Sequence, residues 1–392
     1  MARVFVAGVG MIPFSKPGKS DSFDVMAEQA IGLALREAGV EYRSVQQAYA
    51  GYVYGDSTCG QAALYRVGMT GIPVFNLNNN CATGSSALLL ARQAIESGQI
   101  DCALAFGFEQ MNPGALASAW SDRPDPMARW NEQSQRLQPA PDAYPAPHLF
   151  GGAGLEYQRL HGTRDETFAK ISEKARRHAR HNERAIFREP ITVEDVLASP
   201  VIYGPLTKLQ CCPPTCGAAA AILVSEAFAR KHGLSGDVAI LAQAMTTDYE
   251  STFSAGSMIK AVGYDMAREA ARAVYEAAGI GPDELDVVEL HDCFTANELL
   301  AYEALGLTAE GTAERFIWDG DNTYGGKVVT NPSGGLLSKG HPLGATGLAQ
   351  CTELVEQLRG LCGPRQVESA RLALQHNIGI GGACVVTLYG KV

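Results

Sequence analysis

Cys81 is the residue with the most evident chemical potential, and it lies in the segment NNNCATGSSA, residues 78–87. A short apolar stretch precedes this segment and a helical pattern from Ala87 to Glu96 follows it, which predicts a strand, a tight turn and a helix. The thiol would lie at the N-terminus of a helix, where backbone N–H groups and the helix dipole favour an anion. That position lowers a thiol pKa and favours a nucleophile, whereas the alternative is a buried cysteine that only packs.

A second segment, NPSGGLLSKGHPLGATG at residues 331–347, surrounds one histidine with glycines. His341 comes just before a predicted helix, in a chain able to bend tightly and to approach a ligand closely. A histidine beside a cysteine can accept the thiol proton, which is the pairing that covalent catalysis needs at neutral pH. The alternative is a histidine that caps or packs in a glycine turn.

The third segment, VELHDCF at residues 288–294, follows a strand-like run, at the place where ligands bind in α/β sheets. His291 and Cys293 are two positions apart, so they point the same way on an extended chain. Together with Cys81 and His341 they could form a Cys2His2 zinc site. We expect no metal, because no pair has the C-x2-C or H-x3-H spacing of such sites.

Three weaker patterns remain open. The glycine-rich turn in QHNIGIGGAC, residues 375–384, could offer backbone N–H groups to an oxyanion, or could simply connect two strands. The cysteines at 211, 212 and 216 are a weak metal pattern for which packing is favoured. A basic stretch over residues 164–188 could hold phosphates or could be a solvated helix face. Its cations are Lys170, Lys174, Arg176, Arg177, Arg180 and Arg184.

The order of the predicted elements indicates an α/β fold with a largely parallel sheet. Residues 27–40 and 267–280 are similar alanine-rich helices that end at glycine, and the sequences CATG at 81–84 and GATG at 344–347 each begin a helix. The helices at CATG and GATG lead to apolar strands at 102–106 and 383–388, which we match to each other. Two similar halves would bring both helix N-termini to one central site.

The length of 392 residues requires more than one hydrophobic core. A region from about 112 to 207 is rich in proline and polar residues and differs from both halves. We therefore divide the chain into an N-terminal half at 1–112, a loop domain at 113–207, a return to the N-terminal half at 208–234 and a C-terminal half at 235–392.

The net charge of −10 argues against nucleic acid as a partner. Ten cysteines without a framework spacing suit a reducing compartment. The longest apolar run, at about 218–224, is too short to span a membrane. The N-terminus has no signal-peptide pattern and the last residues are not a peroxisomal signal, so we expect a cytoplasmic protein.

With these segments in view, the chain resembles the thiolase family, and within it the thiolases of the sterol-carrier-protein type. The resemblance covers essentially the whole length, and four segments contain its motifs: NNNCATGSSAL, ELHDCFTANELL, NPSGGLLSKGHPLGATGLAQ and QHNIGIGGA. It implies a five-layer α-β-α-β-α fold of two similar halves, with an inserted loop domain that binds coenzyme A. It also implies a homodimer or homotetramer, with coenzyme A as a substrate and no other cofactor.

By the same resemblance, Cys81 corresponds to the acylated nucleophile, His341 to the histidine that activates it, and His291 to a position where ordinary thiolases carry asparagine. Ordinary thiolases have a second catalytic cysteine in a Cys-x-Gly motif, but residues 377–379 are Asn-Ile-Gly here. The resemblance therefore assigns the acid/base role to Cys293, if its thiol pKa falls, while we expect Cys384 to pack.

The backbone N–H groups of Cys81 and Gly379 would form one oxyanion hole, and His341 with His291 the other. Among the basic residues, Arg176, Arg177 and Arg180 are the candidates for coenzyme A binding. Cys216 replaces an aspartate that relatives usually have before Gly-Ala-Ala-Ala, and the sequence offers no reason for this difference.

The resemblance implies thiolytic cleavage of a 3-oxoacyl-CoA, with long, 2-methyl-branched or sterol side-chain substrates suggested by the branch alone. A condensing synthase, a retro-aldol lyase and a non-catalytic acyl-CoA or lipid-binding protein are the alternatives. The intact Cys81 argues against the lyase, and the full set of reactive side chains argues against the non-catalytic protein.

Overall fold

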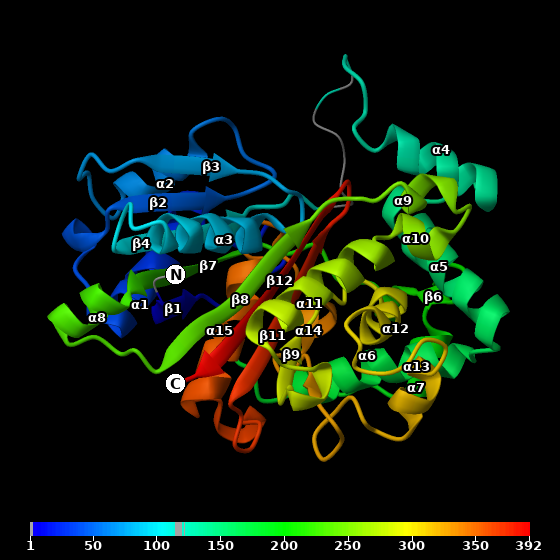
Figure 1. Cartoon of the computed structure of the whole chain (residues 1–392). Coiled ribbons are helices and arrows are strands. Elements are labelled where there is room, and N and C mark those ends of the chain that lie inside the picture. The colour runs from blue at the N-terminus through cyan, green and yellow to red at the C-terminus, as the bar shows by residue number, and fades with distance from the viewer. Residues whose placement is uncertain (1–2, 114–119, 121) are drawn as a thin grey trace.

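The structure is a computed structural model that describes residues 3–113, 120 and 122–392. Its main sheet consists of β1 (Val4–Met11), β2 (Gln47–Gly51), β3 (Val74–Leu77), β4 (Cys102–Glu109), β7 (Gly217–Ser225), β8 (Val238–Thr246), β9 (Val287–Glu289), β10 (Val329–Thr330), β11 (Leu372–Gly379) and β12 (Ala383–Lys391). These ten strands are hydrogen-bonded in the order β10-β9-β11-β12-β8-β1-β7-β4-β2-β3 (Figure 1). Counted inward from its two ends, the sheet has corresponding strands in the same order, so two similar halves meet at β8 and β1.

Strand pairing repeats between the halves, which confirms the duplication. The strand β2 is parallel to β3 and β4, as β9 is to β10 and β11. The strands β4, β7 and β1 are antiparallel neighbours, as are β11, β12 and β8. The expectation of a largely parallel sheet was therefore wrong, because the last strand of each half returns antiparallel. Our match of 102–106 with 383–388 was also wrong, since β4 corresponds to β11.

Four helices form the layers around these strands. The helix α1 (Phe23–Ala38) packs on β1 and β7, and α11 (Tyr264–Ala278) packs on β8 and β12. Between the two halves lie α3 (Thr83–Glu96) and α15 (Thr346–Arg359), which contact each other, and α15 touches strands of both halves (Figure 1). This is the expected five-layer arrangement, and it brings the N-termini of α3 and α15 to the middle of the molecule.

Glycines at the start of the chain allow the first outer layer to approach its strand. A Cβ atom at Gly8 would collide with the backbone of Ala38, and one at Gly10 would collide with Ala30, both in α1. The Gly-x-Gly pattern at 8–10 therefore serves helix packing.

The remaining elements lie mostly in or next to the region 113–207, of which residues 114–119 and 121 are outside the described part. They are α2 (Cys59–Tyr65), α4 (Ala128–Leu137), α5 (Pro145–His161), α6 (Asp165–Ala179), α7 (Val193–Ala198), β5 (Val201–Tyr203), β6 (Leu206–Thr207), α8 (Glu226–His232), α9 (Ser251–Ser254), α10 (Met258–Ala261), α12 (Thr295–Ala304), α13 (Ala313–Trp318) and α14 (Gly335–Ser338). The helices α5 and α6 cover α12, and α6 also packs on α14, so the insertion lies over the C-terminal half (Figure 1).

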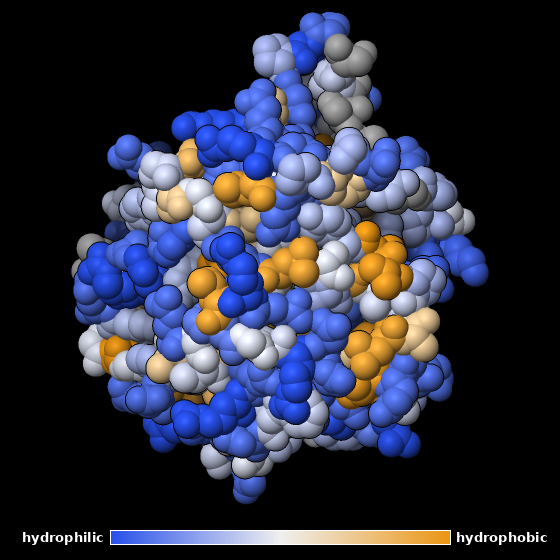
Figure 2. Space-filling view, turned by 90° about the vertical axis from the view of Figure 1, so that its right-hand side faces the viewer, coloured by the Kyte–Doolittle hydropathy of each residue, from blue (hydrophilic) through white to orange (hydrophobic). Residues whose placement is uncertain are grey.

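Figure 2 shows the face formed by this insertion, where separate hydrophobic areas interrupt a mainly hydrophilic surface. Exposed apolar side chains of the insertion include Leu160 and Val201. No described helix has the length and apolar character needed to cross a lipid bilayer.

Candidate active site

Three of the predicted site residues meet at the junction of the halves. The Cys81 sulfur and one ring nitrogen each of His291 and His341 all lie within 4.8 Å of one another. The imidazole rings have centroids 5.2 Å apart and are nearly perpendicular, at 82°. The side chains come from the loop before α3, the loop after β9 and the loop before α15. All are nearly enclosed, with 8%, 2% and 5% of Cys81, His291 and His341 exposed.

Local backbone contacts hold Cys81 in its loop. Asn80 has a positive φ of 51°, a conformation that asparagine tolerates better than most residues. The Ala82 N–H donates to the Asn79 carbonyl at 3.1 Å, and the Asn79 N–H donates to the Thr83 hydroxyl at 2.8 Å. The helix α3 begins at Thr83, so the thiol lies just before its first turn.

His341 is fixed on its backbone and on one ring nitrogen. Its N–H donates to the Thr215 hydroxyl at 3.0 Å, and Nδ1 is 2.7 Å from the hydroxyl of Thr346. The Thr346 hydroxyl donates to the carbonyl of Pro342, so its oxygen accepts from Nδ1–H. Nε2 is buried and has no hydrogen-bond partner among the described residues. His341 can therefore present an unprotonated nitrogen to the site.

His291 is also fixed on its backbone and on one ring nitrogen. Its Nδ1 is 3.0 Å from Nδ2 of Asn377 in β11. Its backbone carbonyl accepts from Asn297, and its N–H donates to Nδ1 of His376 at 3.4 Å. The ring therefore has a fixed orientation beside His341.

Cys293 lies beside this group as a second buried thiol, with 5% of it exposed. Burial raises its pKa well above the usual range, and negative charge on Cys212, Cys81 or Asp292 would raise it further. The N–H of Cys212 donates to the Cys293 carbonyl at 2.9 Å. Cys212 is a third thiol next to the site, which the sequence analysis had assigned to packing or a weak metal pattern.

Burial reverses our expectation for the thiol pKa values. Removal from water raises the pKa of Cys81 to about 12, with a smaller contribution from Glu109, because a thiolate loses its hydration there. The same effect lowers the pKa of His341 to about 3 and that of His291 well below its usual range. The cluster is therefore a neutral thiol with neutral imidazoles, and the helix N-terminus does not offset the cost of burying an anion.

Glu109 is a charged neighbour that the sequence analysis missed. It ends β4, is 1% exposed, and accepts hydrogen bonds from the backbone N–H groups of Val53, Tyr54 and Gly344 at 2.8–3.1 Å. Burial raises its pKa to about 7, although these bonds partly oppose the shift. The carboxyl group thus links the loop after β2 to the loop that contains His341.

Comparison with known proteins identifies this arrangement. Residues 4–137 match the thiolase N-terminal domain, and residues 249–389 match the thiolase C-terminal domain-like family. Over 398 residues the chain is 54% identical to sterol carrier protein 2 of Oryctolagus cuniculus. The aligned region covers 99% of this chain and 72% of that protein. The chain belongs to the thiolase family. It is a thiolase-family acyltransferase, related to the thiolase domain of that protein.

Solved structures agree on the fold. The Ltp2–ChsH2(DUF35) aldolase is similar with a TM-score of 0.83 and 24% identity, over 99% of this chain and 98% of that one. Human mitochondrial 3-ketoacyl-CoA thiolase in complex with CoA is similar with a TM-score of 0.75 and 20% identity, over 100% of this chain and 98% of that one. Both similarities cover the insertion as well as the two halves.

Three further cysteines of this thiolase have different environments. Cys384 is fully buried in β12, where it packs in the core of the C-terminal half, as expected. Cys216 is also fully buried, and its sulfur lies 3.2 Å from the N–H and 3.5 Å from the carbonyl of Met111. The Cys216 side chain thus contacts the backbone just after β4. The cysteine at this unusual place therefore has a structural role. Cys211 lies near the Thr207 carbonyl, at 3.4 Å.

Glycine at position 379 is required by the approach of two segments. A Cβ atom there would collide with the carbonyl of Asn79 and would lie 3.1 Å from the N atom of Ala82. The end of β11 therefore packs directly against the Cys81 loop.

Within the described residues, two groups could hold a metal ion: Cys81 with His291 and His341, and Glu353 with Glu356 and Cys362. Thiolate and imidazole are donors that zinc accepts. The four-residue set considered from the sequence does not form, because Cys293 is outside the group, and Cys211, Cys212 and Cys216 form no group either.

The basic stretch at 164–188 divides into paired and exposed cations. Lys174 is buried in an ion pair with Glu298, and Arg184 pairs with Glu356, so the phosphate-binding interpretation was wrong for both. Arg176 is half-buried and stacks on the ring of Phe187. The exposed residues Arg177 and Arg180 lie at the end of α6 and just beyond it.

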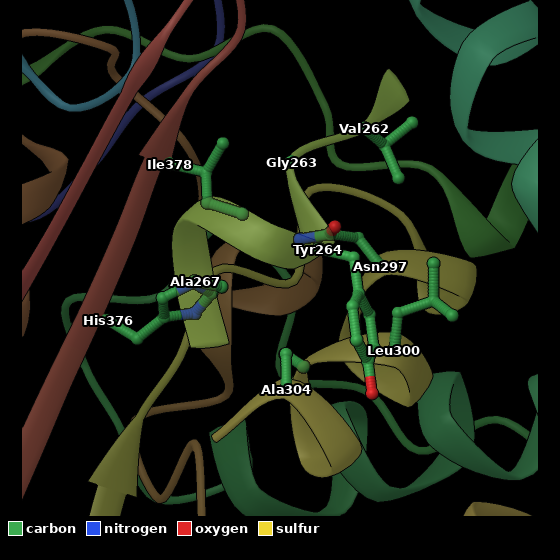
Figure 3. Close-up of a pocket in the computed structure, with 10 residues that line it drawn as sticks. Val262, Gly263, Tyr264, Ala267, Asn297, Leu300, Ala304, His376 and Ile378 are labelled. Carbon is green, nitrogen blue, oxygen red and sulfur yellow. The ribbon is translucent and has the colours of Figure 1, made fainter. Parts of the chain in front are cut away.

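A small cavity lies behind the His291 loop rather than at the cysteine. Figure 3 shows His376 and Ile378 of β11 facing Tyr264 and Ala267 of α11 and Leu300 of α12 across it. Its volume of about 10 Å³ is roughly that of one water molecule. It is too small for a substrate, and its lining includes none of Cys81, His291 and His341.

Proposed function

We propose that this enzyme cleaves a 3-oxoacyl-CoA with coenzyme A through an acyl group on Cys81. The supporting observation is the meeting of the Cys81 thiol with His291 and His341 within 4.8 Å, beside a second buried thiol. A nucleophile next to a base and a separate acid is the set of groups that a two-step acyl transfer requires.

In the first step, the Cys81 sulfur attacks the 3-keto carbon and its proton passes to His341. Because both groups are neutral at rest, the proton leaves as the C–S bond forms rather than before it. The C2–C3 bond then breaks, its electron pair goes to the enolate of acetyl-CoA or propanoyl-CoA, and Cys293 donates a proton to C2.

In the second step, coenzyme A enters and the Cys293 thiolate takes the proton of its thiol. The new thiolate attacks the thioester on Cys81, and the shortened acyl-CoA leaves while Cys81 regains a proton from His341. The cycle consumes no proton and no electron overall. The high pKa of Cys293 in the closed site suits a group that must give up its proton only to a strong base such as an enolate.

Two oxyanion holes are part of this proposal. His341 and His291 would stabilise the enolate-type oxygen, and the backbone N–H groups of Cys81 and Gly379 would stabilise the tetrahedral oxygen. The close packing of Gly379 on the Cys81 loop supports the second assignment.

Coenzyme A binding is assigned to the loop domain at 113–207. The name of one structural neighbour states that it holds CoA. Arg177 and Arg180 are exposed cations of this region, and the overall charge of −10 leaves phosphate binding to such local groups. Arg176 would contribute less, because its side chain is stacked on Phe187.

A homodimer is proposed from the edge of the sheet. The outermost strand, β3, is incompletely buried, and Phe75 within it is 45% exposed. Tyr65 and Met69, in and after α2, are 53% and 77% exposed. An exposed edge strand with apolar neighbours is a ready surface for pairing with a second copy.

A retro-aldol lyase is the second candidate, because one structural neighbour is named as an aldolase. A lyase would release an aldehyde or ketone with no acyl-enzyme and would not need coenzyme A. The presence of Cys81 against two histidines favours the thiolase reaction.

The test is an assay of purified enzyme with a panel of straight-chain, 2-methyl-branched and sterol side-chain 3-oxoacyl-CoA esters, each with and without coenzyme A. We expect loss of the 3-oxoacyl-CoA enolate absorbance and of free thiol in equal amounts. Cleavage of a 3-hydroxyacyl-CoA without consumption of coenzyme A would instead establish the lyase. Condensation without any thiolysis would establish a synthase.

A further inference from the structure

We propose that Gln375, Ser85 and Asn377 form a hydrogen-bond chain that holds His291 with its ring proton on Nε2. His291 is then a hydrogen-bond donor to the reacting oxygen and cannot act as a base. The inference deepens the proposed function and depends on it for its catalytic meaning, but the position of the proton can be measured without substrate.

The chain of hydrogen bonds begins at the carbonyl oxygen of Gly347, which can only accept. Backbone carbonyl oxygens only accept hydrogen bonds, and the Gly347 carbonyl lies 2.7 Å from the side-chain amide of Gln375. The amide nitrogen Nε2 must therefore face Gly347, and the amide oxygen accepts from the Tyr389 hydroxyl. Gln375 and Tyr389 are fully buried, and Gly347 at the start of α15 is buried as well.

The second link is the hydroxyl of Ser85 in the first turn of α3. Nε2 of Gln375 donates its other proton to this oxygen at 2.8 Å. The Ser85 hydroxyl then donates its own proton to Oδ1 of Asn377 at 2.7 Å, and in the described part of the chain this is its one acceptor. The donor and the acceptor of each hydrogen bond therefore follow from those of the bond before it.

The third hydrogen bond joins Asn377 to His291. Since Oδ1 of Asn377 faces Ser85, Nδ2 is the atom 3.0 Å from Nδ1 of His291. An amide NH2 group only donates, so Nδ1 of His291 must be the unprotonated nitrogen. A neutral imidazole has one ring proton, which therefore lies on Nε2. Burial and the neighbouring His341 keep the ring neutral by lowering its pKa.

The two histidines of the cluster thus have opposite roles. Thr346 accepts from Nδ1–H of His341 and leaves Nε2 free to take a proton. Asn377 donates to Nδ1 of His291 and leaves Nε2–H free to donate. Asn377 and Ser85 are positioning residues, because they act through His291, and Asn377 lies where ordinary thiolases have their second catalytic cysteine.

The experiment is nitrogen NMR of the full-length enzyme labelled with ¹⁵N-histidine, in which protonated and unprotonated ring nitrogens resonate in separate ranges. The His291→Gln variant identifies the signal of this ring. We expect an unprotonated Nδ1 in the wild-type enzyme. The variant Asn377→Asp replaces the donor with an acceptor, so it should move a proton to Nδ1. Ser85→Ala removes the hydroxyl that orients Asn377, so the signal should broaden or divide between two forms.

Ser172→Ala is the matched control, because Ser172 is a buried serine that donates to the Leu209 carbonyl outside the site. It should leave the His291 signal unchanged. In thiolysis assays, Asn377→Asp should lower kcat by about 10²–10³-fold with little change in KM, which is typical for loss of one oxyanion donor.

A proton on Nδ1 of His291 in the wild-type enzyme would overturn the proposal. An unchanged His291 signal in folded Ser85→Ala and Asn377→Asp would do the same, even if activity fell. A wild-type enzyme with the expected signal but no thiolysis would leave the chain in place and contradict the proposed function instead.

Discussion

The two halves of the main sheet have the same strand pairing but deliver different chemistry to the centre. In the N-terminal half, the loop before α3 supplies a thiol, Cys81. In the C-terminal half, the loop before the corresponding helix α15 supplies an imidazole, His341. The duplicated architecture therefore sets where the groups meet, and the residue at each helix N-terminus sets what each half does.

The residues in and after the neighbouring strands also differ between the two halves. The loop after β9 supplies His291 and Cys293, and β11 supplies Asn377. In the proposed mechanism, these residues of the C-terminal half transfer protons and orient a hydrogen-bond donor. The N-terminal half provides the proposed nucleophile and one carboxyl group, Glu109. We therefore expect loss of the thiol in the N-terminal half to abolish acylation, whereas substitutions of the site residues in the C-terminal half should impair particular proton transfers.

The largest effect should come from the thiol. Cys81→Ala removes the bond-forming atom, so kcat for thiolysis should fall by about 10⁴-fold or more. The variant should fold normally, because alanine fits the buried space of cysteine. The measurement is the loss of 3-oxoacyl-CoA enolate absorbance with coenzyme A present. Residual activity within about tenfold of wild type would contradict a nucleophilic role and so remove the contrast between the halves.

A smaller loss is expected from the second thiol, with a matched control in the same half. Cys293→Ala removes the acid/base group and should lower kcat by about 10²–10⁴-fold. Cys384→Ala alters a cysteine that is also buried but packs in β12, so its kinetics should stay near wild type. Steady-state thiolysis of both variants is the measurement. The opposite result would move the acid/base role to Cys384.

The smallest effect concerns Glu109 and should appear only as a pH dependence. Above about pH 7 its carboxylate is charged and raises the pKa of Cys81, whereas below that pH it is neutral. Glu109→Gln should therefore speed iodoacetamide alkylation of Cys81 a few-fold at about pH 9 and leave it nearly unchanged at about pH 6. Mass spectrometry of the Cys81 peptide measures the rate. An equal change at both pH values would mean that Glu109 acts only through the backbone it holds.

Local patterns were enough to predict much of the fold. The repeat at 27–40 and 267–280 corresponds to α1 and α11, which both end at glycines of positive φ, Gly39 and Gly279. The two helix N-termini with CATG and GATG led to the correct central layer. The antiparallel return of β7 and β12 was missed, because alternating strand and helix patterns do not reveal the direction in which a strand enters the sheet.

The sequence predicted only those site residues that lie in segments with a recognisable pattern. Cys81, His291 and His341 stand in glycine-rich turns or at a strand end, and the structure brings them together. Glu109 and Cys212 reach the site through contacts between distant segments, for which a single sequence has no signal. The thiol pKa was wrong in direction, because burial depends on the packed environment and outweighs the local effect of the helix.

Trapping the acyl group is the most direct measurement of the central claim that Cys81 is acylated. With coenzyme A left out, the enzyme should form the acyl-enzyme but not release it, since the second step lacks its attacking thiol. After brief exposure to a 3-oxoacyl-CoA and proteolysis, we expect mass spectrometry to show the shortened acyl group on the peptide that contains Cys81. An acyl group on another residue, or turnover of the wild-type enzyme with Cys81 never modified, would contradict the account.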